Sequence, residues 1–276
     1  MESIFALVRS GTIIMIPLLF AAAGGLLPAL SGKLNIALEG LLLGGAFFAL
    51  VVYHITGNVT AAITAAALAA MLLSALHAFA AFRLKANFFI TGLAINLFAG
   101  GLCIILSDRW FNTRGVIVSQ AVDGLFWGYL SGGLLLIVIL SLLIFKTPFG
   151  LRLRASDKQS KALISLGIKP QNYQIAALLI SGIFCGIGGS YLSLNLGAFV
   201  PGMSAGKGWI ALVVIFLGGK KPVGVLIAAL VYGLTEAFSI RAQGFLTLPA
   251  DFILAFPYIL TLIAMIVVSV FSREIK

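Results

Sequence analysis

The chain has 276 residues, of which 61% are hydrophobic and only 9% are charged, and its mean hydropathy is +1.16. A soluble domain carries roughly 25% charged residues, so this composition excludes a soluble protein. A transmembrane β-barrel would show short segments of alternating polarity, which are absent. The composition therefore predicts an all-α, polytopic helical membrane protein, organised as one transmembrane domain over residues 1–276.

Apolar segments long enough to be membrane helices follow one another along the chain, since one span needs about 20 mostly apolar residues. The segment 209–219 is an exception, because eleven residues of helix cover only about 16 Å of a hydrocarbon core roughly 30 Å thick. We therefore expect about 8–9 apolar segments, at residues 11–30, 36–53, 59–82, 87–106, 126–145, 173–193, 209–219, 223–240 and 252–271.

The net charge of +10 is explained by the connections between these segments. The connection 146–172 carries six basic residues and one acid, so the positive-inside rule places it in the cytoplasm. Alternation of the spans then gives twelve basic residues and two acids on that side. The outer connections 107–125 and 241–251 hold three of each. The charge follows membrane topology, and we expect no nucleic-acid partner.

One short pattern occurs twice. Residues 31–45, SGKLNIALEGLLLGG, match residues 205–219, AGKGWIALVVIFLGG, at eight of fifteen positions. The loop charges make the two copies run in opposite directions, as in an inverted repeat. Each copy interrupts an apolar run with Gly-Lys, and Gly32 and Gly206 permit a turn there. We expect two broken, re-entrant helices in an inverted repeat, since paired interruptions of this kind mark a substrate pathway near the midplane.

Polar and aromatic side chains near these breaks are candidates for the pathway, because intramembrane polar groups usually face a cavity. The bland alternatives are that Lys33 and Lys207 snorkel to the interface and that Asn96 joins neighbouring helices by hydrogen bonds. Glu236 is expected to pair with Arg241 and to have a structural role. The candidate pathway residues are Asn35, Glu39, Asn96, Phe88, Phe89, Lys207 and Trp209.

The connection 146–172 contains one polar stretch that suits a short helix outside the membrane, residues 156–168. Ser156 is expected to cap this helix, and Gly167 to end it. An apolar strip of Ala162, Leu163 and Leu166 would then face a soluble partner or, equally, the membrane surface.

The segment TPFGLRLRASDKQSKALISLGI resembles the coupling-helix segment of permease subunits in bacterial ABC importers for ribose, branched-chain amino acids and nucleosides. LSGKLNIALEGLLLGGAFFA resembles their early broken segment, and PGMSAGKGWIALVVIFLGGKKPVGVLIAALVYG their late one. NIALEG, ANFFITGLAINLFAGG and LPADFILAFPYILTLIAM are most similar to the nucleoside-type branch. The coupling segment departs from the family at Asp157, Lys158 and Gln159, where Gly-Glu-Asn is usual, and at Leu163, where a second alanine is usual.

The resemblance implies a multi-pass permease subunit in a bacterial cytoplasmic (inner) membrane, in contact with membrane lipid. It would pair with a second homologous permease, as a heterodimer, and with ATP-binding cassette subunits and an external substrate-binding protein. ATP would be hydrolysed by the cassette subunits, so this chain would not be an enzyme. The residues implied in ATPase coupling are Arg152, Arg154, Ala155, Ser156, Ala162, Leu163, Leu166 and Gly167.

The subunit would form half of the translocation pathway for a small polar solute, and the solute expected from the resemblance is a nucleoside. Riboflavin, or a monosaccharide such as ribose, would satisfy the same side chains. A stand-alone ion-coupled secondary transporter remains a rival, because broken helices suit that class too, although it would need buried carboxylates beyond Glu39 and Glu236. We expect no cofactor and no metal site, and we expect Cys103 and Cys185 to be free packing residues in apolar spans.

Overall fold

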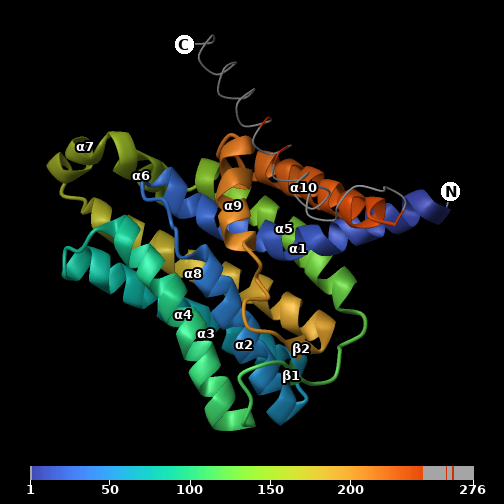
Figure 1. Ribbon diagram of the computed structural model, residues 1–276. Helices are drawn as coiled ribbons and strands as arrows, with labels where there is room; N and C mark the ends of the chain where they lie inside the picture. The colour runs from blue at the N-terminus through green and yellow to red at the C-terminus, as the bar shows by residue number, and fades with distance from the viewer. Residues whose placement is uncertain (1, 245–258, 260–262, 264–276) are drawn as a thin grey trace.

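The computed structural model describes residues 2–244, 259 and 263 (Figure 1). Seven of its described helices are long and apolar enough to cross a membrane, which confirms a polytopic helical membrane protein. Apart from residues 259 and 263, the expected segment 252–271 lies outside the described residues. The seven are α1 (Glu2–Leu30), α2 (Leu38–Thr56), α3 (Val59–Ala78), which continues into the π-helical turn η1 (Phe79–Arg83), α4 (Phe88–Phe111), α5 (Leu125–Lys146), α8 (Pro170–Leu196) and α10 (Pro222–Ala242).

Local sequence explains where several helices begin. The side chain of Asn58 accepts hydrogen bonds from two backbone N–H groups in the first turn of α3, and Asn87 does the same for α4. Such caps satisfy N–H groups that a helix start leaves free. Gly57, in the left-handed region at φ +64°, forms the tight turn between α2 and α3.

Helix α8 lies at the centre of the bundle and packs against α1, α2 and α3. Small residues allow these contacts, because helices in lipid associate through close van der Waals packing. A Cβ atom on Gly186 would collide with the backbone of α3 at Ala66, and one on Gly189 would collide with the backbone of α2 at Leu42. The glycines of GIFCGIGG therefore determine how tightly the core closes.

Exposed apolar residues distinguish the peripheral helices from the core. In the apolar window of α1, 83% of the residues are buried, whereas the corresponding share in α4 is only 28%. Leu97 on α4 is 79% exposed and Leu135 on α5 is 60% exposed. These faces match a hydrocarbon environment. Both cysteines are buried and unpaired, as expected.

The connection 146–172 forms two helices, α6 (Pro148–Lys158) and α7 (Ser160–Ser165). The expectation that Ser156 caps a helix was wrong. Thr147 is the N-cap, because its side chain accepts from Gly150 N and proline occupies the following position, which favours a helix start. Ser156 instead lies in the last turn of α6 and donates to Leu153 O at 2.6 Å.

The second half of this connection agrees better with what the sequence predicted. Gly167 has φ +73° and follows α7, as expected of a glycine that ends a helix. The expected apolar strip is divided, however. Leu163 is buried against the bundle, whereas Ala162 and Leu166 are exposed, together with Ile164.

At the other end of the bundle, the connection after α4 and the segment after α8 are tied by a short antiparallel ladder. Strand β1 (Ile117–Val118) pairs with β2 (Ala198–Phe199). Beyond the ladder, Ser119 N donates to Gly197 O at 2.8 Å. The connection after α4 is thereby fixed to the segment that leads from α8 toward the short helix α9 (Lys207–Leu217).

Candidate functional site

The chain leaves helical structure at both expected breaks. Residues 31–37 separate α1 from α2, and residues 200–206 precede α9, which has eleven residues. Gly32 and Gly206 have φ values of +78° and +81°, a conformation that residues with a Cβ atom rarely adopt. In Figure 1, α2 and α9 begin close together and run in opposite directions, as an inverted repeat requires.

The starts of α2 and α9 are in direct contact. Glu39, in the first turn of α2, accepts hydrogen bonds from Gly206 N at 2.9 Å and from Gly208 N at 2.7 Å. A Cβ atom on Gly208 would collide with the backbone of Glu39. The two breaks thus form one site, in which the backbone of one helix start touches that of the other.

Two asparagines satisfy the backbone of the first break. Asn96 of α4 accepts from Gly40 N at 2.8 Å and donates to Ile36 O at 2.9 Å. Asn35 is fully buried, accepts from Ala37 N at 3.1 Å and donates to Ser181 Oγ at 3.0 Å. Irregular backbone at membrane depth needs such partners, and the two asparagines supply them from α4 and from the break itself.

The remaining predicted pathway residues lie at different distances from this centre. Lys207 is partly exposed at the first position of α9, and Trp209 is 42% exposed in its first turn. Phe88 is linked to the first break by Lys33, whose Nζ lies 5.7 Å from the centroid of its ring. Phe89, 55% exposed, lies on the surface of α4.

Sequence reasoning missed two residues, one on α8 and one on α6, that contact the first break. Gln174 of α8 donates from Nε2 to Ser31 O at 3.2 Å. Asp157 of α6 lies so close to Gly32 that a Cβ atom there would be 2.5 Å from its carboxylate oxygen. Gln174 could have been found as a polar residue at the edge of an apolar span. Nothing in the local sequence pairs Asp157 with Gly32.

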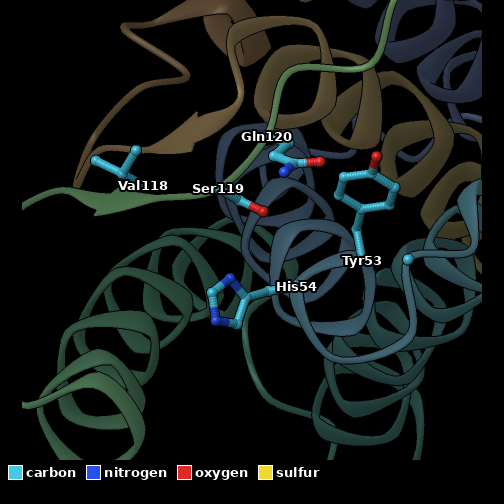
Figure 2. Close-up of a pocket in the computed structure, with 6 residues that line it drawn as sticks. Tyr53, His54, Val118, Ser119 and Gln120 are labelled. Atoms are coloured by element: carbon cyan, nitrogen blue, oxygen red, sulfur yellow. The ribbon is translucent and has the colours of Figure 1, made fainter.

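A pocket of about 400 Å³ opens on the opposite side, between the end of α2 and the connection after β1. Figure 2 shows Ser119 and Gln120 of that connection facing Tyr53 and His54 of α2. The His54 ring packs edge-on against Phe111, with centroids 5.4 Å apart. Hydroxyl, amide and imidazole groups therefore gather at the C-terminal end of α2, the helix that starts at the first break.

Comparisons with known proteins agree with this architecture. A nucleoside ABC transporter permease protein, NupC of Lactococcus lactis subsp. cremoris, is 30% identical over 90% of this chain and 87% of its own length. A guanosine ABC transporter permease protein, NupQ of Bacillus subtilis, has the same identity and coverage. A putative glucose ABC transporter permease protein, TsgC13 of Haloferax volcanii, is 28% identical over 82% of this chain and 74% of its own length.

A solved structure shares the fold at low sequence identity. PsaBC from Streptococcus pneumoniae, in complex with Fab, superposes with a TM-score of 0.59 at 10% identity, covering 93% of this chain and 89% of that one. Residues 7–268 match the family described as the permease component of branched-chain amino acid transport systems. With seven candidate spans in its described residues, the chain is a multi-pass inner-membrane protein that belongs to this ABC permease family.

Proposed function

We propose that this permease subunit carries a nucleoside, and that the meeting point of the two breaks forms its half of the translocation pathway. The observation that carries the proposal is the contact between the starts of α2 and α9, through Glu39 and the N–H groups of Gly206 and Gly208. Two helix breaks that meet in this way bring polar backbone into the membrane only where a cavity or protein satisfies it.

The side chains around this point suit a nucleoside, which has a flat base and a polar ribose. Trp209 offers a partly exposed aromatic face at the start of α9, and aromatic faces stack on bases. Lys207 and Asn96 are partly exposed and polar. Phe88 and Phe89 would extend the apolar wall along α4. Asn35 is fully buried with both ends of its amide bonded, so its proposed role is to hold the break open rather than to touch the solute.

We further propose that a second homologous permease completes the pathway as a heterodimer, with two ATP-binding cassette subunits and an external substrate-binding protein. The cassette subunits would hydrolyse ATP, and this chain would not. Their docking surface is proposed on α6 and α7, where Ala162, Ile164 and Leu166 are exposed. Arg152, Arg154, Ala155, Ser156, Leu163 and Gly167 would hold this surface in place.

One alternative solute has support from a specific observation. The relative TsgC13 is named as a putative glucose permease protein, so a monosaccharide is the second candidate. An ion-coupled secondary transporter is less well supported, because both carboxylate oxygens of Glu39 accept backbone hydrogen bonds. A coupling ion would have to displace those bonds.

The test is reconstitution of the chain with its second permease, cassette subunits and binding protein in proteoliposomes. We expect uptake of radiolabelled guanosine, adenosine or uridine that requires both the cassette subunits and ATP. Uptake of glucose or ribose, with no uptake of any nucleoside, would replace the proposed solute. Uptake driven by a proton or sodium gradient without cassette subunits would overturn the whole proposal.

A further inference from the structure

Helix α9 receives its N-terminal cap from another helix. Its N-cap position is Gly206, which has no side chain, and no side chain of α9 or of the preceding segment caps it. The N–H groups of Gly206 and Gly208 are instead bonded by the carboxylate of Glu39, at 2.9 and 2.7 Å. Hydrogen bonds from N–H groups to an ionised carboxylate are roughly twice as strong as those between neutral groups. Glu39 thus does for α9 what an N-cap residue does for its own helix.

Electrostatics explains why an acid is needed at this place. Each helix start carries a partial charge of roughly +0.5, and here two starts are in contact. Lys207 adds a full positive charge at the first position of α9. These charges repel one another in a membrane interior, where screening is weak. A carboxylate in the first turn of α2 and within hydrogen-bond distance of the start of α9 attracts both helix ends.

The backbones of α2 and α9 pack too closely at this contact to admit a side chain at position 208. Gly208 packs directly on the backbone of Glu39, so a side chain at position 208 would push α9 away. Around Gly206, in contrast, a Cβ atom would meet nothing within 4 Å. The contact therefore depends on one carboxylate and one glycine.

The α2 side of this contact is fixed to the rest of the bundle. Asn96 holds Gly40 and Ile36 from α4, and Asn35 links the break to Ser181 of α8. Glu39 thus connects α9 to a frame that three helices support. The hydrogen bonds of Glu39 therefore fix the positions of Lys207 and Trp209, which are partly exposed at the start of α9.

We propose that Glu39 is a positioning residue for transport: its carboxylate joins the second break to the first and thereby sets where Lys207 and Trp209 meet the solute. This inference rests on the proposed function, in which the breaks form the pathway. It differs from a direct role, in which Glu39 would bind the solute itself. The glutamate acts through the start of α9.

The test uses the complete transporter, with Cys103 and Cys185 replaced by alanine and Trp209→Cys as a reporter. The reporter is labelled with a small charged thiol reagent. Glu39→Gln and Gly208→Ala are each expected to increase the labelling rate by about threefold or more. In the corresponding proteins with Trp209 intact, both should lower the maximal transport rate by about tenfold with KM nearly unchanged, as expected when a charge-assisted hydrogen bond is lost. Glu39→Asp should recover part of the rate.

Matched controls separate this role from general damage. Gly101→Ala adds a methyl group on α4 where nothing lies within 4 Å, and Asp108→Asn removes a surface acid that pairs with Arg114. Neither should alter labelling or transport. Glu39→Gln and Gly208→Ala should be less than additive when combined, because both release the same contact.

Several outcomes would overturn the inference. These are unchanged labelling in both variants, wild-type transport in both, or a change of solute preference with unchanged labelling, which would make Glu39 a solute ligand. The proposed function is tested separately by the Trp209→Cys parent. If its cysteine is unreactive and solute gives no protection, the breaks do not form the pathway, whatever Glu39 does.

Discussion

The two breaks share a sequence pattern but are supported in different ways. The first, residues 31–37, has a turn at each end and three residues of irregular structure between them, and its backbone is bonded by side chains from α4 and α8. The second, residues 200–206, is a run of turns closed mainly by its own backbone, such as Met203 N to Val200 O at 2.9 Å and Ala205 N to Gly202 O at 2.9 Å. The repeat determines where the chain breaks, and the surroundings determine how the break is stabilised.

The two breaks are also connected to opposite sides of the protein. The first touches α6, through Gly32 beside Asp157, and α8, through Gln174. The second is tied to the connection after α4 through the β1–β2 ladder. Glu39 joins them. A conformational change at either end of the bundle would therefore reach the site through a different break. Substitutions at aligned positions of the two breaks should accordingly differ in their effects on stability and transport.

The largest difference is expected at the aligned positions Asn35 and Trp209. Asn35→Leu leaves Ala37 N–H unpaired in a fully buried site, which should cost about 1–3 kcal/mol of stability. Trp209→Leu removes a side chain that is 42% exposed and should cost less than about 1 kcal/mol, while still reducing transport. Thermal unfolding of the purified transporter in detergent measures both. Equal losses of stability would show that the two breaks are supported alike.

The sequence alone predicted which segments are helices and where the two breaks lie. Helical spans, both breaks and their opposite directions follow from hydropathy, loop charge and the repeated Gly-Lys. The contacts between the breaks could not be predicted, because they depend on which helices pack together. Glu39 and Gly206 are 167 residues apart, and one sequence without relatives gives no sign of their pairing.

The connection 146–172 shows why local sequence signals also fail. Ser156 is an ordinary capping residue by type, yet the helix that contains it is capped nine positions earlier, by Thr147 before Pro148. Leu163 was expected to be part of an exposed strip but is buried against the bundle. Tertiary packing decides both which residue caps the helix and which apolar side chain is buried, and neither can be predicted from the local sequence.

A smaller difference is expected between the two left-handed glycines. Gly32→Ala and Gly206→Ala should each cost about 1–2 kcal/mol, because an L-residue is strained at these φ values. Only Gly32→Ala also displaces Asp157, so it alone should raise the ATP hydrolysed per solute transported. Combining it with Asp157→Ser should restore that ratio. If both glycine variants hydrolysed a similar amount of ATP per solute transported, α6 would not be coupled to the first break.

The smallest effect is expected from weakening the outer connection of the second break. Ser119→Pro removes the N–H that donates to Gly197 O at 2.8 Å, because proline has no backbone donor. One neutral hydrogen bond contributes about 1 kcal/mol, so stimulation of ATP hydrolysis by the external binding protein should fall by about fivefold at most. Basal hydrolysis should stay the same, because the first break and α6 are untouched. Ser119→Ala keeps the N–H and serves as the control. If Ser119→Pro changed basal hydrolysis and left stimulation intact, the ladder would not connect the outer face to the second break.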